Sequence, residues 1–197
     1  MTARQITSMV IAAALLSALL NSCSSAPTRL YTLYAVPPPA SASTRYSGPA
    51  IRIDVVHVPP GLDRIEVVSN LSPGELKVND LDHWSAPLSQ IAKQALSADL
   101  VARLPPGRVI FPHLAKPEGT LGVSVDILDF RADSSGTTLE AGWIITSANP
   151  ETAARRGTAQ FRGRGSGAGA SATADALSAL LAELADRIAA DVAHDGD

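Results

Sequence analysis

The side chains that could carry out catalysis are few and widely separated along the chain. The histidines are His57, His83, His113 and His194. No two of them have the close spacing of a zinc-binding helix. Asp126 and Asp129 lie on one predicted strand, where ideal alternation puts them on opposite faces, so they form a poor acid–base pair. We therefore expect no metal site and no pair of catalytic carboxylates.

The glycine-rich segment 165–170 is the pattern closest to a cofactor site. It contains G-x-G-x-x-A between a predicted strand and a predicted helix, as in dinucleotide-binding loops. One helix follows it, with no second parallel strand whose end could hold an acidic residue against a ribose. A nucleophile elbow is also missing, because Arg164 stands where the first glycine before Ser166 is needed. We expect a loop of small residues, no cofactor, and a protein that is not an enzyme.

The single cysteine, Cys23, follows a run of apolar residues. Arg4 is the only charged side chain in residues 1–8, and residues 9–20 are almost wholly apolar, which is the layout of a secretory signal. The run is shorter than the ~20 residues that a membrane span needs. A buried N-terminal helix is the alternative, although such a helix would be expected to show a polar face.

The segment Leu20-Asn21-Ser22-Cys23 resembles the lipobox of bacterial lipoproteins, with Asn21 at a position where a small or apolar residue is usual. The resemblance implies that Cys23 becomes the new N-terminus and carries lipid chains, palmitate among them. Several acyl chains hold a protein firmly on a membrane. In enterobacterial sorting an aspartate at the next position retains a lipoprotein at the inner membrane, so Ser24 favours the outer membrane, with the inner membrane as the alternative.

These signals divide the chain into four parts. Residues 1–22 are predicted to be a lipoprotein signal peptide, residues 23–30 a lipidated tether, residues 31–193 one domain and residues 194–197 a polar tail. The domain would then face the periplasm. The net charge of −3 argues against a nucleic-acid partner.

Alternating apolar residues predict most of the domain to be strands separated by proline and glycine turns. The predicted strands are 29–36, 51–55, 64–69, 75–79, 109–111, 121–127, 139–145 and 158–164. Apolar stripes at helical spacing predict helices at about 87–104 and 173–192. This order predicts a single-domain α/β sandwich with a mixed, largely antiparallel sheet and two principal helices. The aromatic residues expected in its core are Trp84, Phe111, Phe130, Trp143 and Phe161.

Short motifs in a fixed order resemble the PqiC-like family of ABC-type transport auxiliary lipoproteins. The motifs are Tyr31-Thr32-Leu33, Val58-Pro59-Pro60-Gly61-Leu62-Asp63-Arg64, Trp84-Ser85-Ala86-Pro87-Leu88, Ala141-Gly142-Trp143 and Leu184-Ala185-Asp186-Arg187-Ile188-Ala189. Gly61, Ile65 and Ala86 depart from the residues that are common there. The likeness covers essentially all of the mature chain.

The resemblance implies a fold similar to the N-terminal domain of TolB-type proteins and an accessory role in MCE-type lipid transport between the two membranes. The implied partners are an MCE-domain periplasmic protein and its inner-membrane transporter, and a second copy of the chain is a further candidate. We expect Leu62, Asp63, Arg64 and Trp84 to be candidate contacts with a partner. Simple core burial of Leu62 and Trp84 is the alternative.

The length of the spacer bears on the choice between functions. Residues 24–30 separate Cys23 from Tyr31, and extended chain at ~3.5 Å per residue gives them a reach of about 25 Å. The domain would therefore stay close to its membrane and a partner would have to reach it. An activator of a cell-wall synthase is the alternative function, but such activators usually need a long disordered tether. A periplasmic hydrolase is a third reading, which no nucleophile–base pair supports.

Overall fold

The computed structural model describes residues 26–39, 45–72, 74–133, 136–147, 149, 153–163 and 169–193. The predicted signal peptide, Cys23, Ser24 and the tail 194–197 lie outside these ranges, as do Arg164 and residues 165–168 of the glycine-rich segment. The elements in chain order are β1 (Arg29–Tyr31), β2 (Ile51–His57), β3 (Glu66–Ser72), β4 (Glu75–Trp84), α2 (Leu88–Arg103), β5 (Leu121–Asp133), β6 (Gly136–Thr146), β7 (Arg155–Gly163) and α3 (Ala170–Ala193).

The strands form two sheets, one in the order β2-β5-β6-β7 and a smaller one in the order β1-β4-β3. Within each sheet one strand pair is parallel, β2 with β5 and β1 with β4, and the other pairs are antiparallel. The predicted α/β sandwich with mixed, largely antiparallel pairing and two principal helices is confirmed. Its division into two sheets depends on pairing between distant segments, which alternation within one strand does not reveal.

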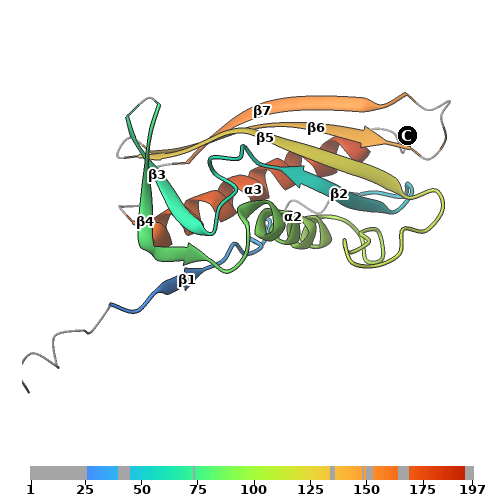
Figure 1. The fold of residues 1–197 in the computed structure, drawn as a ribbon. Helices are drawn as coiled ribbons and strands as arrows, with labels where there is room; N and C mark the ends of the chain where they lie inside the picture. The colour runs from blue at the N-terminus through green and yellow to red at the C-terminus, as the bar shows by residue number, and fades with distance from the viewer. Residues whose placement is uncertain are drawn as a thin grey trace, which may run out of the picture.

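Both helices cover the same face of the four-stranded sheet, and β1 and the β3–β4 hairpin lie at one end of the domain (Figure 1). The predicted apolar stripes form the buried faces of the helices, because side chains three and four apart point the same way. The buried stripe of α2 comprises Leu88, Ile91, Ala92, Ala95, Leu96 and Leu100, and that of α3 comprises Leu177, Leu180, Leu181, Leu184, Ile188 and Val192.

Four of the five predicted core aromatics are buried, namely Trp84, Phe130, Trp143 and Phe161. The prediction for Phe111 is wrong. Its side chain is 41% exposed, and its ring stacks on that of His113 with 6.0 Å between the ring centroids. The predicted strand at 109–111 contributes an isolated bridge from Val109 to Ile51.

The first strand ends at Tyr31, five residues earlier than the predicted limit at Val36. The backbone beyond it makes its hydrogen bonds with helix side chains rather than with a neighbouring strand. The N–H of Tyr34 donates to Ser178 Oγ at 3.3 Å, and the N–H of Val36 donates to Asp99 Oδ1 at 2.9 Å. This segment therefore crosses the helices instead of continuing a sheet.

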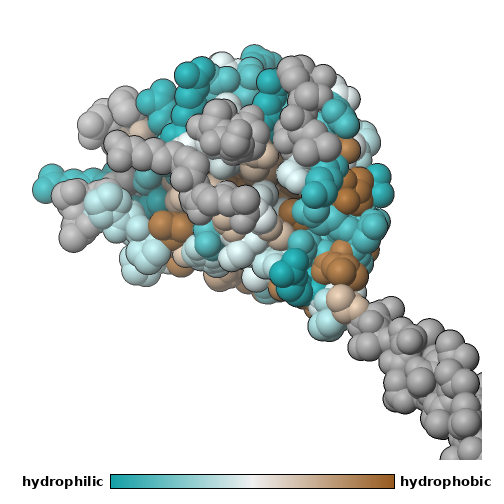
Figure 2. Space-filling model, turned by 90° about the vertical axis from the view of Figure 1, so that its left-hand side faces the viewer, coloured by the Kyte–Doolittle hydropathy of each residue, from teal (hydrophilic) through white to brown (hydrophobic). Residues whose placement is uncertain are grey.

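The surface at the β1 end of the domain is mostly hydrophilic in the view of Figure 2. A few hydrophobic residues stand out there, and some of them lie next to the point where the described N-terminal segment begins (Figure 2). Among the described residues, no helix is both long enough and apolar enough to cross a membrane.

Candidate functional site

The four residues predicted to contact a partner lie close together, but they differ in exposure. Leu62 and Trp84 are 9% and 3% exposed and belong to the main hydrophobic core. Their burial agrees with the alternative interpretation of these two side chains, in which they support the surrounding turn. Partner contact through this region remains a prediction for its exposed residues.

Asp63 holds the start of α2. Its Oδ1 accepts the backbone N–H of Ser89 at 2.8 Å, and its Oδ2 accepts the Ser89 hydroxyl at 3.0 Å. The residue at the N-cap position is Pro87, which makes no side-chain capping hydrogen bond. Asp63 thus satisfies a helix-terminal N–H from a distant turn, and its negative charge is favourable at a helix N-terminus.

We expect Asp63→Ala to lower the free energy of unfolding by about 1–2 kcal/mol, because Ser89 loses its acceptor and α2 loses its cap. Urea unfolding followed by circular dichroism measures the change. Asp80→Ala, which removes a carboxylate from an exposed position of β4, is the matched control. Equal stability of the Asp63 and Asp80 variants would show that the cap contributes nothing.

Arg64 and the neighbouring Ile65 form the exposed part of this turn. The Arg64 Nε donates to Glu66 Oε2 at 3.2 Å, and this hydrogen bond holds the pKa of the Glu66 carboxyl below its usual value. Ile65 is 50% exposed, and its carbonyl oxygen accepts the Trp84 N–H at 2.6 Å. The buried Trp84 therefore fixes the backbone that presents an exposed cation and an exposed apolar side chain side by side.

A shallow groove of about 490 Å³ borders the same turn on the outer face of the four-stranded sheet. Its lining residues come from β5, β6, β7 and the chain after β2, and they include Pro59, Asp126, Leu128, Gly142, Arg156 and Thr158. Gly142 has no side chain that could fill the groove. A Cβ built at this position would come no closer than 3.6 Å to a neighbouring atom, Thr158 Cγ2. Sequence reasoning missed this groove, although a glycine at an outward position of an alternating strand is a signal for it.

The carboxylates of Asp126 and Asp129 lie on the same side of β5, so the prediction of opposite faces is wrong. A β-bulge between Ile127 and Asp129 inserts one residue and resets the alternation. Asp126 borders the groove, whereas Asp129 forms an ion pair with Arg131 at 2.6 Å. Across the residues that the structure describes, no three potential metal ligands come together.

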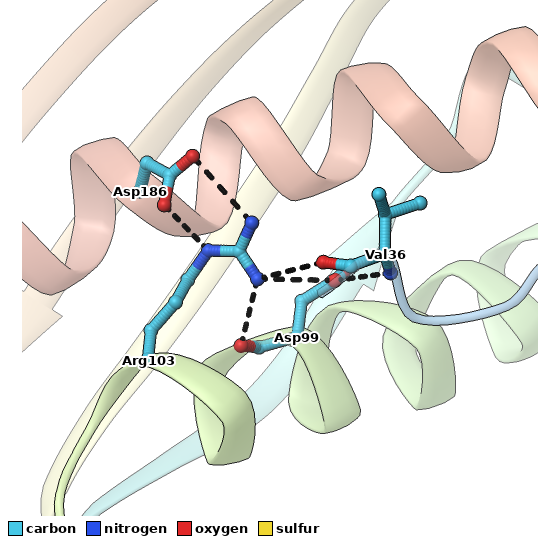
Figure 3. A network of polar contacts seen from close by, with 4 residues as sticks. All are labelled: Val36, Asp99, Arg103 and Asp186. Atoms are coloured by element: carbon cyan, nitrogen blue, oxygen red, sulfur yellow. Dashed lines mark hydrogen bonds and ion pairs between the residues drawn. The ribbon is translucent and has the colours of Figure 1, made fainter. Parts of the chain in front are cut away.

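The segment after β1 is fixed to both helices by a polar network, buried at Asp99 and Arg103, that joins Val36, Asp99, Arg103 and Asp186 (Figure 3). The guanidinium of Arg103 donates through Nε to Asp186 Oδ1 at 2.6 Å and through Nη1 to the Val36 carbonyl at 3.2 Å. The same Nη1 donates to the backbone oxygen of Asp99 at 3.0 Å and to its Oδ1 at 3.3 Å. Arg103 thus links the N-terminal segment, α2 and α3.

Burial makes the charge of Asp99 costly. Its side chain is fully buried, and this desolvation raises the pKa of the carboxyl to about 6, against the opposing effects of the Val36 N–H and the Arg103 charge. Its Oδ2 has no hydrogen-bond partner among the residues that the structure describes. The sequence analysis did not predict the buried Asp99–Arg103 ion pair. Two opposite charges four residues apart, next to the buried positions Leu96 and Leu100, could have indicated it.

Comparison with known proteins gives the family of the chain. Residues 31–189 match the family described as ABC-type transport auxiliary lipoprotein component. No curated protein matches the chain significantly.

Two solved structures share the fold. A crystal structure of an uncharacterized protein is 18% identical, with a TM-score of 0.66, over 85% of this chain and 99% of the other. A Xanthomonas campestris protein of the DUF330 family is 15% identical, with a TM-score of 0.59, over 81% of this chain and 92% of the other. Together with the family match, which spans nearly the whole folded domain, this shows that the chain belongs to the ABC-type transport auxiliary lipoprotein family.

Proposed function

We propose that this protein is a lipid-anchored docking component on the periplasmic face of the outer membrane, serving an MCE-type lipid transport system. Membership of a transport-auxiliary lipoprotein family supports the coarser role, an association with a membrane and with an ABC-type transport system. The partners in this proposal are an MCE-domain periplasmic protein and, through it, an inner-membrane transporter. The protein's part is to bind and position, without catalysis.

The observation that carries the proposal is the position of β1. This strand begins at Arg29, six residues after Cys23, and it pairs with β4. Six extended residues reach about 20 Å, so a domain anchored through Cys23 stays beside its own membrane. Ser24 is the sorting residue that directs the anchor to the outer membrane. A cell-wall synthase activator would need a longer tether than this spacing allows.

The docking surface in this proposal combines the exposed turn residues Arg64 and Ile65 with the adjacent groove. The groove floor is apolar around Gly142, and Asp126 and Arg156 place opposite charges among its lining residues. A surface of this kind suits the distal end of an MCE-domain protein that inserts an apolar side chain and pairs its flanking charges. Apolar anchors with polar surroundings are the usual composition of a docking interface.

The test is to purify the full-length protein in mild detergent from cells grown with labelled palmitate. We expect label on the chain and an MCE-domain protein in the same eluate. The double variant Arg64→Glu, Ile65→Asp is expected to keep the label and to lose most of the partner, about tenfold in recovery, because it reverses a charge and removes an apolar contact.

The matched control is Val101→Asp, which changes an apolar residue of α2 that is 44% exposed. This control should retain the partner. A wild-type protein without palmitate would contradict the anchor, and a labelled protein that never retains an MCE-domain partner would contradict the docking role. Equal recovery with the double variant and the control would remove Arg64 and Ile65 from the docking surface.

A further inference from the structure

The outer face of the three-stranded sheet exposes two leucines on neighbouring strands. Leu30 of β1 is 69% exposed and Leu81 of β4 is 43% exposed. Leu30 is aligned with His83, two residues beyond Leu81, while the alternate β4 residues Asp82 and Trp84 are buried. The exposed Leu81 therefore lies on the same outward side as Leu30, one position before the stretch of β4 that pairs with β1.

This pair of leucines lies next to the start of the folded chain. Leu30 is seven residues from Cys23, and hydrophobic residues appear beside the entry of the N-terminal segment in Figure 2. Leu81 lies on β4, the strand that pairs with β1, whereas other exposed apolar residues of the described chain, such as Val101 on α2 and Leu128 on β5, lie outside this sheet.

The strand that carries Leu30 is held rigidly on the domain. Arg29 forms two hydrogen bonds with the Asp82 carboxylate, at 2.7 and 3.0 Å, and the Tyr31 carbonyl oxygen accepts the Ser85 N–H at 2.7 Å. Leu30 thus has a fixed direction relative to the body. The Arg29 side chain, aligned with Asp82, lies on the side of the strand opposite to Leu30.

We propose that this face rests on the phospholipid bilayer, with Leu30 and Leu81 inserted among the headgroups. The proposal rests on the lipid anchor at Cys23 that belongs to the proposed function. An anchor of about 20 Å brings this end of the domain to the bilayer surface, where exposed apolar side chains gain by leaving water.

The contact would orient the domain. Lipid chains on Cys23 alone limit only the distance between the domain and the membrane, whereas two leucines on a paired sheet also fix which side of the domain faces the membrane. The bilayer interface accepts apolar side chains to a depth of about 5–10 Å, which two leucines on a strand pair can occupy without unfolding. The docking turn and groove are then presented in one constant direction.

The experiment uses single cysteines in the full-length lipidated protein, in which acylation blocks Cys23, the one native thiol. Leu30→Cys and Leu81→Cys are labelled with a polarity-sensitive fluorophore. Leu128→Cys and Val101→Cys, at residues that are 53% and 44% exposed, are the controls. Each protein is reconstituted into phosphatidylethanolamine–phosphatidylglycerol vesicles with brominated acyl chains, and flotation confirms that it is bound.

We expect a blue-shifted emission and several-fold stronger bromine quenching at positions 30 and 81 than at positions 101 and 128. Floated protein with equal quenching at all four positions would overturn the membrane contact and leave the anchor intact. Protein that fails to float would overturn the anchor and the contact together. Thermal unfolding of each labelled protein confirms its fold before reconstitution, and agreement between two independent positions guards against an artefact of either one.

Discussion

Replacing Arg103 with alanine is expected to lower the free energy of unfolding by about 3–5 kcal/mol, the cost of leaving a buried charge without its partner. The Asp99 side chain is 0% exposed, and Arg103 forms an ion pair with it at 3.3 Å. The substitution also removes the hydrogen bonds to Asp186 and to the Val36 carbonyl. Urea unfolding at pH 7.5, followed by circular dichroism, measures the loss.

The control for this prediction is Arg187→Ala, which removes an exposed arginine from α3. A loss as small as that of the control, a few tenths of a kcal/mol for an exposed site, would show that the network does not stabilise the fold. Limited proteolysis adds a local readout. Because Arg103 holds the Val36 carbonyl, the segment after β1 should become more susceptible to cleavage in Arg103→Ala than in the control.

Asp99→Asn tests the same network through its pH dependence. The pKa of Asp99 is raised from 3.8 to about 6, so the folded protein binds this proton more readily than the unfolded chain. The contribution of this carboxyl to stability is therefore greatest below pH 3.8 and is lost as the pH rises through about 6. The stability of Asp99→Asn relative to wild type should rise across that interval, by up to about 3 kcal/mol, and stay constant above it. A difference that does not change with pH would contradict the raised pKa.

Gly157→Ala is the second substitution with a large expected effect, a loss of about 3 kcal/mol from overpacking. A Cβ at position 157 would lie far inside van der Waals contact with the indole ring of Trp143, which covers this glycine from the adjacent strand. The ring cannot move freely, because it is 3% exposed and its Nε1 donates to Asp191 Oδ2 of α3 at 2.8 Å. Relief of the clash would break that hydrogen bond and shift β7 away from α3.

Gly142→Ala is the matched control, since Gly142 lies on the strand beside Gly157 and its Cβ would make only ordinary contacts, the nearest at 3.6 Å. Unfolding curves and tryptophan fluorescence report on both variants. The control should unfold within about 0.5 kcal/mol of wild type, as expected for an unstrained surface change. A Gly157→Ala protein as stable as this control would show that the Trp143 ring can be displaced at no cost.

The sequence alone predicted most of the elements and the fold class, because a helix or a strand imposes its period on nearby residues. The stripe around Leu96 and Leu100 and that around Leu180 and Leu184 identify the buried faces of both helices. Alternation through Val123 and Val125 identifies a strand with one buried face. These patterns are local, and each can be detected without knowing which other segment packs against it.

The candidate site was predicted less completely, because exposure depends on what covers a residue. The motif around Leu62, Asp63 and Arg64 does form a turn beside Trp84, but only the three-dimensional packing shows that Leu62 and Trp84 are core and that Asp63 caps α2. The β-bulge in β5 inserts one residue, so Asp129 points to the other face of the sheet from the one that regular alternation predicts.

The contacts between residues far apart in the chain could be learned only from the tertiary structure. Val36, Asp99 and Asp186 converge on Arg103 from three separate segments, and the outer groove is assembled from strands that become neighbours only on folding. Such contacts depend on which segments pack together, and the free energy that selects this packing comes from burial shared by the whole core. The sequence by itself therefore determines the periodic elements, while the shape of the proposed docking and membrane-facing surfaces exists only in the folded chain.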